Sequence, residues 1–443
     1  MEKLVRDPAS ARAVLALAGP AILAQLLQTG VLYADRVMLG HHSATALGAM
    51  HVAGTVEWTL VSLASAYAVG VLGLVGRATG AGDRDAARRH TTLAVQLAVI
   101  VGVITAVIAA TAILPLLPRL FPGAPSGPGT ALAGAHDYLA AALYAAPFYC
   151  VGAVGFAALS ASGDTVTPLK IGVVVNLVHI GVNFVLIPKL GARGAGLSTA
   201  GSFALEAVLT LAALSRAGRY ATLRPFRLGF SRADLVALLE PSGPAFLERV
   251  VYHAAYMAFV WMTARLGDDA MATNQVLIAV EAISFMTVEG FATAAGALVA
   301  QELGAGRRAS AARVGWMAAG QAVVTLSAFG VAFYVLRFRL PALVTPRADL
   351  QATAAGALVI CAFAQPFMAL SVVLGQSLRG AGATRLSLFA SLFAGFGVRL
   401  AATWYATTRL SLGLTGVWLG STADWVVRTV VVALLWGSKI WAR

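Results

Sequence analysis

Acidic residues inside apolar stretches are the part of this chain whose type and position suggest chemistry. The chain has 19 Asp and Glu residues, and seven of them fall within stretches that are long and apolar enough to cross a membrane. They are Asp35, Glu57, Glu206, Glu248, Glu281, Glu289 and Asp424. A charged side chain at the centre of a bilayer costs about 2.5–3.5 kcal/mol on insertion scales. We therefore expect each of the seven to face a cavity, to pair with a cation or to carry a proton.

Asp35 has polar neighbours at its own predicted depth in the membrane. It lies near the outer end of the first apolar stretch, while His179 and Asn183 lie in the outer half of the fifth. The sixth stretch begins on the outer side, which places Thr199 about one turn below the surface. A carboxylate beside an imidazole gives two groups whose proton occupancy burial can tune. The four residues are thus predicted to bind a cation together, unless His179 only packs between helices and Asp35 only pairs with an arginine.

Three other acids are candidates for lining a substrate cavity. Glu57 and Glu281 are 281 − 57 = 224 residues apart, at equivalent depths, and as a pair they would attract cationic molecules. Glu248 follows Pro244 by four residues, and the neighbouring Arg249 could neutralise its charge.

Asp424 and Arg428 are four residues apart on one helix, so we expect them to form a structural ion pair. Glu206 corresponds to Arg428 at an offset of 222 and is grouped with them as structural. For Glu289, helix packing and cavity lining both stay open.

Aromatic and thioether side chains suit adaptable binding of flat organic cations. The predicted contacts of this kind are Tyr33, Tyr252, Tyr256 and Met286. At helical spacing such residues also occur as core or lipid-facing positions.

The elements that position these groups must be membrane helices. Charged residues make up only 12% of the chain and its mean hydropathy is +0.80, so the apolar surface must meet lipid. The sequence predicts an all-α integral membrane protein with twelve transmembrane helices. Their ranges are 13–38, 48–76, 91–117, 136–161, 168–188, 195–216, 235–264, 270–300, 313–337, 349–377, 384–410 and 412–437.

The second half of the chain repeats the first. Gly19-Pro20-Ala21 recurs as Gly243-Pro244-Ala245, and the segments 74–82, 163 and 191–194 recur at 298–306, 382 and 413–416. Six helices per copy make the copies parallel, with a pseudo-two-fold axis along the membrane normal. We predict one lobe at 1–218, a cytoplasmic linker at 219–231 and a second lobe at 232–443. Pro20 and Pro244 would kink the first helix of each lobe, either as hinges or as static kinks.

The net charge of +13 reflects topology and not a nucleic-acid partner. Most of the 32 Lys and Arg residues fall on one side of the predicted helices, as the positive-inside rule requires when both termini are cytoplasmic. These basic loops would contact lipid headgroups. Cys150 and Cys361 lie in predicted spans and do not match across the repeat, so neither a disulfide nor a metal site is expected.

Several motifs resemble the multidrug and toxic compound extrusion (MATE) family, in particular its prokaryotic branch. The matching segments are Asp35 to Gly40 (DRVMLG), Gly76 to His90, Leu159 to Pro168, Gly194 to Thr199 and Ser284 to Gly306. The resemblance covers nearly the whole chain. It implies a monomeric cation-coupled antiporter of the plasma (inner) membrane that expels amphipathic, often cationic, drugs or xenobiotics by rocking two lobes. In the family, the positions of Asp35, His179, Asn183 and Thr199 hold a cation-binding group.

This chain departs from the family pattern at His179, where asparagine is usual, and at Asn183, where some members carry aspartate. Na⁺ prefers several hard oxygen ligands, which an imidazole does not supply. We therefore favour H⁺ over Na⁺ as the coupling ion.

Two other function classes fit the sequence less well. The nearest is a flippase for lipid-linked saccharides or lipid precursors, but such proteins carry a cationic cavity, whereas the intramembrane residues here lean acidic. An intramembrane enzyme is disfavoured because no H-E-x-x-H, G-x-S-x-G or G-x-x-x-x-G-K-[ST] motif is present. No cofactor is expected.

Overall fold

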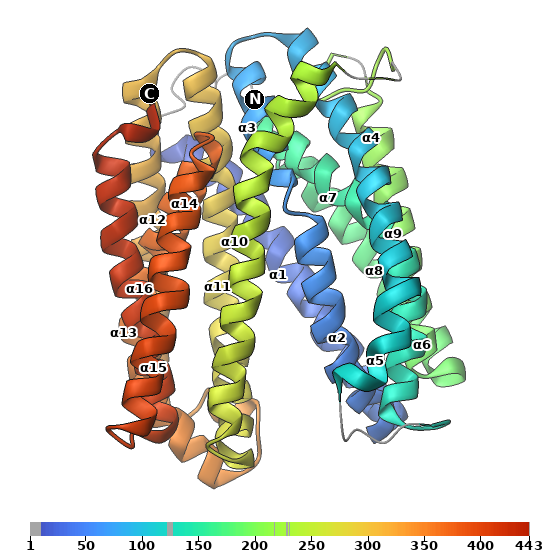
Figure 1. The fold of residues 1–443 in the computed structure, drawn as a ribbon, viewed down its shortest axis with the longest axis vertical. Coiled ribbons are helices and arrows are strands. Elements are labelled where there is room, and N and C mark those ends of the chain that lie inside the picture. Colours follow the sequence, from blue (N-terminus) through green and yellow to red (C-terminus); the bar gives the residue numbers. More distant parts are fainter. Residues whose placement is uncertain (1–9, 122–126, 217, 227–228, 230, 443) are drawn as a thin grey trace. The chain divides into compact units, whose positions relative to one another are not determined.

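The structure is a computed structural model that describes residues 10–121, 127–216, 218–226, 229 and 231–442. Within these residues it contains helices and no strands (Figure 1), so the predicted fold class is confirmed. Contacts between residues divide the chain into two compact units. The first unit runs from Leu23 to Leu239, and the second comprises the residues up to Ile22 together with Glu240–Arg443.

The first unit is built from helices of the first sequence copy. Their bounds are α1 (Ala11–His42), α2 (Ala44–Ala64), α3 (Ala68–Gly80), α4 (Arg84–Ile108), the π-helix η2 (Ala109–Ile113), α5 (Leu114–Leu120), α6 (Ala131–Tyr144), α7 (Ala146–Ala161), α8 (Val166–Leu190) and α9 (Ala192–Leu214). Helix α9 packs against α6, α7 and α8, and these contacts position the polar residues of the unit.

The second unit repeats the succession of long helices. Its elements are α10 (Arg232–Ala264), α11 (Asp268–Gly304), α12 (Arg308–Val335), the 3₁₀-helix η3 (Pro341–Leu343), α13 (Ala348–Gly380), α14 (Thr384–Ala390), the π-helix η4 (Ser391–Val398), α15 (Arg399–Thr408), α16 (Gly413–Gly437) and the 3₁₀-helix η5 (Ile440–Ala442). Helix α13 lies at the centre of this unit, in contact with α11, α12 and α16.

The first helix of each copy belongs to both units. The start of α1 packs with the second unit, where Val14 and Leu17 join the core around Phe291. Gly290 of α11 has no side chain to keep Ile22 away, since a Cβ there would overlap with the Ile22 backbone. Conversely, the start of α10 packs with the first unit through Leu238. The unit boundaries therefore lie inside α1 and α10, whereas the lobe ranges 1–218 and 232–443 stay a prediction about the repeat.

The repeated glycines adopt matching backbone conformations. Gly82 and Gly306 both have φ +74°, and Gly191 and Gly413 both have φ +55°. These are left-handed conformations that glycine adopts without a steric penalty. After Gly82 and Gly306, the next backbone N–H closes the helix end in the same way, at 3.0 Å (Asp83 to Ala78 O) and 2.9 Å (Arg307 to Glu302 O). The sequence repeat is thus also a repeat of local structure.

The lengths of the helices suit a membrane. Ten helices or continuous helical runs among the described residues are long and apolar enough to span one, and eleven if α6 and α7 count as one span bent by 55°. Helix α10 is as long but carries Glu248, Arg249 and His253 near its middle and is not among them. The predicted number of twelve stays a prediction.

Candidate functional site

Asp35, on α1, lies at the centre of a buried polar cluster in the first unit. His179 Nε2 on α8 is 2.9 Å from Asp35 Oδ1 and 3.1 Å from Oδ2. Asn183 Nδ2 donates to Asp35 Oδ1 at 2.6 Å. Asp35 and His179 are each 5% exposed, and Asn183 is fully buried. The structure therefore brings three of the four predicted cation-coupling residues into direct contact.

Helix α8 can present these groups because its buried residues follow one face. Apart from Pro168 near its start, they recur every four positions: Ile171, Val175, His179, Asn183 and Ile187. Side chains at i and i+4 lie above one another on a helix. Glycines on α9 allow the close approach that buries this face, since a Cβ on Gly194 would overlap with the Leu186 carbonyl of α8. Packing on both sides thus fixes the imidazole and the amide against Asp35.

The second ring nitrogen of His179 is held by two hydroxyls of α9. His179 Nδ1 lies 2.8 Å from Ser202 Oγ and 3.3 Å from Ser198 Oγ. The Ser202 hydroxyl donates to the Ser198 carbonyl at 2.9 Å, and the Ser198 hydroxyl to the His179 carbonyl at 3.2 Å. Every group is satisfied when these hydroxyls donate to carbonyls and accept from Nδ1–H. The contact between Nε2 and Asp35 then needs one further proton, on the imidazole or on the carboxyl group.

The fourth predicted residue, Thr199, contacts a separate pair of polar side chains, Tyr138 and Glu57. Its hydroxyl lies 3.2 Å from Tyr138 Oη on α6, and Tyr138 donates to Glu57 Oε2 on α2 at 2.8 Å. Thr199 itself makes no hydrogen bond to Asp35 among the described residues. Asn183 Oδ1 is buried without a hydrogen-bond partner within that part of the chain. Tyr138, Ser198 and Ser202 are members that sequence reasoning missed, although the four-residue spacing of the two serines on α9 was a usable signal.

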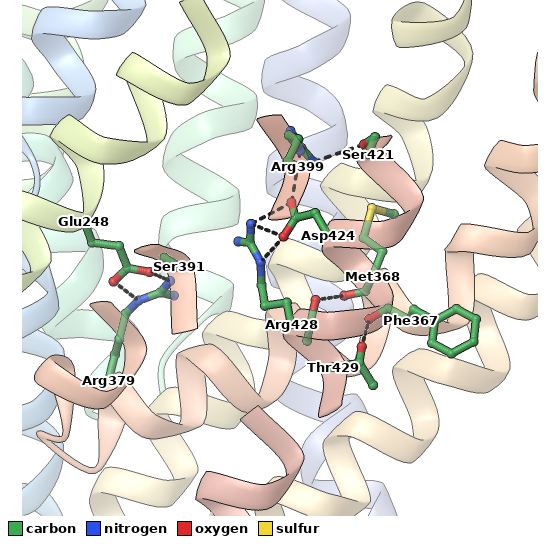
Figure 2. A network of polar contacts seen from close by, with 11 residues as sticks. Glu248, Phe367, Met368, Arg379, Ser391, Arg399, Ser421, Asp424, Arg428 and Thr429 are labelled. Atoms are coloured by element: carbon green, nitrogen blue, oxygen red, sulfur yellow. Dashed lines mark hydrogen bonds and ion pairs between the residues drawn. The ribbon is translucent and has the colours of Figure 1, made fainter. Parts of the chain in front are cut away.

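In the second unit, the buried carboxylate of Asp424 is paired differently (Figure 2). Its side chain is fully buried and receives three hydrogen bonds of 2.7–3.0 Å from Arg428, one turn later on α16. Arg399 of α15 adds a second ion pair at 3.0 Å and donates to Ser421 at 3.1 Å. The predicted contact between Asp424 and Arg428 is present, and Arg399 is a partner that the sequence did not suggest. Two guanidinium groups share one carboxylate here.

Glu248 also binds a guanidinium group, as Figure 2 shows. Arg379, near the end of α13, lies 2.8 Å from Glu248 Oε1, and Ser387 and Ser391 donate to the same oxygen at 3.1 and 2.7 Å. The ion-pair partner of Glu248 is Arg379, while neutralisation of its charge by Arg249 stays a prediction. Arg379 is 131 residues away along the chain, so no local pattern could have indicated it.

The other predicted cavity residues each make contacts within the unit to which they belong, or are partly exposed. Cys361 donates its thiol to Glu281 Oε1 at 3.5 Å, so Glu281, like Glu57, contacts a donor in its own unit. Tyr33 is 38% exposed, with Arg36 stacked 5.9 Å from its ring centroid, and Tyr252 contacts the ring of His253. Tyr256 and Met286 are half-buried. The drug-binding role of these residues stays a prediction.

Metal chemistry has no evident ligand set in the described residues. No group of three or more His, Cys, Asp and Glu side chains there could hold a metal ion. Cys150 and Cys361 are both buried and free.

The repeat, the buried ionisable groups and the membrane helices agree with a comparison of protein families. The MatE family profile matches residues 20–185 and 244–404, which is one match in each copy. The chain belongs to the MatE family. It is a multi-pass membrane transporter of this family, and the resemblance predicted from the sequence motifs is confirmed.

Known MatE proteins are similar over nearly their whole length. A probable multidrug resistance protein NorM of Thermotoga maritima is 26% identical over 446 residues, covering 98% of this chain and 94% of that protein. A protein of the same name from Bradyrhizobium diazoefficiens is 29% identical, covering 92% and 88%.

Solved structures share the fold. An outward-facing multidrug resistance MATE family transporter superposes with a TM-score of 0.90 at 20% identity, covering 98% of this chain and 96% of that one. A transporter of the MOP superfamily from Pyrococcus furiosus, described as having a binding pocket of reverse polarity, gives 0.88 at 20% identity with the same coverage.

Proposed function

We propose that the chain is a multidrug efflux antiporter that exchanges external H⁺ for amphipathic, often cationic, small molecules from the cytoplasm. The names of its relatives, multidrug resistance proteins, support the substrate class. The choice of H⁺ rests on one observation, the buried contact of 2.9 Å between the Asp35 carboxylate and His179 Nε2. The Asp35–His179 pair can gain or lose one proton without binding any other ion.

The oxygen ligands around Asp35 are few, which supports H⁺ over Na⁺. Asn183 Oδ1 is free among the described residues, but Thr199 turns its hydroxyl toward Tyr138. An imidazole nitrogen, not an oxygen, contacts both carboxylate oxygens of Asp35. Hard cations such as Na⁺ favour several oxygen ligands. Na⁺ is the alternative coupling ion.

In the mechanism, proton binding changes the charge of the buried cluster. An external proton bound between Asp35 and His179 cancels the carboxylate charge, which lowers the cost of burying the cluster in a low-dielectric interior. The first unit then favours a second packing with lower drug affinity, and the drug leaves outward. A proton can drive release only because it binds the two states with different affinities.

Pro20 and Pro244 are proposed as hinges. Pro20 lies in α1 two residues before Ile22, after which α1 passes from the second unit to the first. Pro241 and Pro244 lie in α10 just after Leu239, where α10 passes from the first unit to the second. Proline removes a backbone hydrogen bond, so a helix bends there at low cost. We further propose a monomer in the plasma (inner) membrane with both termini cytoplasmic.

The proposal is tested by efflux of a fluorescent organic cation from proteoliposomes, with the pH gradient and the Na⁺ gradient collapsed separately. We expect collapse of the pH gradient alone to stop efflux. Efflux that stops only when the Na⁺ gradient is collapsed would replace H⁺ by Na⁺. A protein that ignores the dye under every gradient would instead fit a lipid-precursor flippase.

A further inference from the structure

Helix α9 carries a line of polar side chains that begins at the Asp35 cluster. Ser198, Ser202, Glu206 and Thr210 follow one another every four residues and therefore share one face. Ser198 and Thr210 are buried, while Ser202 and Glu206 are half-buried. Such a line inside an otherwise apolar membrane helix points to a transported or exchanged polar species.

The face meets α7 at two glycines. A Cβ on Gly152 would overlap with Glu206 Oε1, and a Cβ on Gly155 would overlap with Thr210 Cγ2. The Glu206 carboxyl group therefore lies directly over the backbone of α7, in space that only a glycine leaves open. Tyr149 and Phe203, whose rings meet edge-on at 5.1 Å, close the α7–α9 contact near this point.

Glu206 has no partner among the described residues, neither an ion pair nor a hydrogen bond. Asp424 and Glu248, by comparison, each bind at least one guanidinium group. An ionised carboxylate without a partner is costly in a membrane span, whereas a protonated one is tolerated. Glu206 is thus placed to take up a proton rather than to hold a cationic side chain.

Ser202 lies between Glu206 and the Asp35 cluster along α9. Its Oγ is 2.8 Å from His179 Nδ1, and His179 Nε2 contacts Asp35 on the other side of the ring. Glu206 follows Ser202 by one turn, about 6 Å along the helix axis. An imidazole can accept a proton at one nitrogen and release one from the other.

We propose that Glu206 is a second proton-binding site of the first unit, which receives the proton that leaves the Asp35–His179 pair. This inference rests on the proposed proton coupling. His179 Nδ1 gives its proton to Ser202 Oγ, and the Ser202 hydroxyl proton passes to the Glu206 carboxylate through water. One proton moves and no electrons do: the pair loses one positive charge and Glu206 loses its negative charge. With the predicted topology, the transfer runs toward the cytoplasm.

Few other ionisable groups can compete for this proton. On the helices packed against α9, the buried or half-buried ones in the described residues are Glu57, Tyr138, Tyr149, Cys150 and His179. The remaining His, Asp, Lys and Tyr residues described on those helices are exposed, as is Arg193 on α9 itself. Glu57 is already bound to Tyr138. Glu206 is therefore the one half-buried carboxylate described beyond Ser202 on this face of α9.

The test compares Glu206→Gln with the wild type in proteoliposomes whose internal and external pH are set independently. The substitution keeps size and hydrogen-bonding capacity but cannot take up a proton. We expect efflux to fall by about tenfold or more and to lose its rise with internal pH, while its dependence on external pH is kept. Ser202→Ala should give the same internal-pH defect with Glu206 intact. Glu240→Gln, which removes an exposed carboxylate on α10, should behave as the wild type.

Infrared difference spectra provide a readout that a purely structural role would not change. Acidification of the wild type should produce a carboxylic-acid C=O band that is missing in Glu206→Gln and persists in Asp35→Asn. An unchanged internal-pH profile in Glu206→Gln, or the absence of this band from the wild type, would overturn the assignment. If wild-type efflux ignores pH gradients, the proposed coupling fails instead, and the infrared band still decides whether Glu206 binds a proton.

Discussion

Asp35 and Asp424 are both buried aspartates in membrane helices, one in each unit, and their partners differ in kind. Asp35 contacts an imidazole and an amide, whereas Asp424 contacts two guanidinium groups. A guanidinium group keeps its charge at every accessible pH, so it holds its carboxylate as an anion. An imidazole can lose its charge within the physiological range. The partners of Asp35 are therefore suited to the proposed proton exchange, whereas Asp424 belongs to an ion cluster.

The same contrast recurs at equivalent positions of the two copies. Glu206 and Arg428 are 428 − 206 = 222 residues apart, which is the offset of the repeat in this region. Arg428 is bound to Asp424 and fills the space left by Gly395, where a Cβ would overlap with it. Glu206 fills the space over Gly152 and has no such partner in the described structure. At equivalent positions, the first copy thus carries a carboxyl group without a partner among the described residues, and the second copy carries a guanidinium group in an ion pair.

The largest effect should follow from neutralising Asp424. Asp424→Asn leaves the half-buried Arg399 and Arg428 without their anion, and breaking an ion pair at a buried carboxylate in this way costs about 3–5 kcal/mol. Thermal unfolding in detergent should report this loss. The double variant Asp424→Asn/Arg428→Gln also removes the positive charge of Arg428. Part of the lost stability should therefore return. A single variant as stable as the wild type would mean that the cluster is not a structural lock.

Neutralising Asp35 should affect transport rather than stability. Asp35→Asn keeps the size of the side chain beside His179 and Asn183 but cannot exchange the coupling proton. We expect efflux driven by a pH gradient to drop by about a hundredfold, with an unfolding temperature close to that of the wild type. Asp269→Asn, which removes a 72% exposed carboxylate, is the matched control and should transport normally. Full efflux in Asp35→Asn would refute the proton switch.

A smaller effect on efflux is expected when His179 is replaced by asparagine, the residue usual at this position in the family. His179→Asn removes the titratable partner of Asp35 and adds an amide oxygen near a carboxylate. We expect efflux driven by pH to fall by about tenfold and efflux to become stimulated by Na⁺, which favours oxygen ligands. Transport rates measured with a pH gradient alone and with a Na⁺ gradient alone distinguish coupling to H⁺ from coupling to Na⁺. Unchanged dependence on pH would show that Asp35 alone carries the coupling.

The sequence could predict the positions of residues that depend only on the direction of a helix and on depth in the membrane. Asp35, His179 and Asn183 could be placed in one layer because each lies at a known distance from the end of its helix, and the structure places them in contact. The same holds for the repeated glycines, because a positive φ depends on local sequence.

Contacts set by the rotation of helices about their own axes were not accessible. Arg379 meets Glu248 and Tyr138 meets Glu57 only because α13 and α6 turn those faces inward. Hydropathy along an almost uniformly apolar helix does not reveal this rotation. The unit boundaries inside α1 and α10 were also not accessible, since sequence order predicts that a helix stays with its own copy.

The smallest effect concerns the hydroxyl that links Glu57 to Thr199. Tyr138→Phe removes this donor and leaves the half-buried Glu57 carboxyl group unpaired, which should lower the free energy of unfolding by about 1–2 kcal/mol. Tyr144→Phe makes the same chemical change at a 53% exposed position of α6 and should have no measurable effect. Tyr138 and Thr199 join Glu57 to α9, the helix that also carries Ser198 and Ser202 beside His179, so the external-pH dependence of efflux should shift in Tyr138→Phe and not in Tyr144→Phe. If Tyr138→Phe lowers stability but leaves the external-pH dependence unchanged, only Asp35 and His179 would exchange the coupling proton. The contrast with the ion cluster around Asp424 in the second unit would then be sharper.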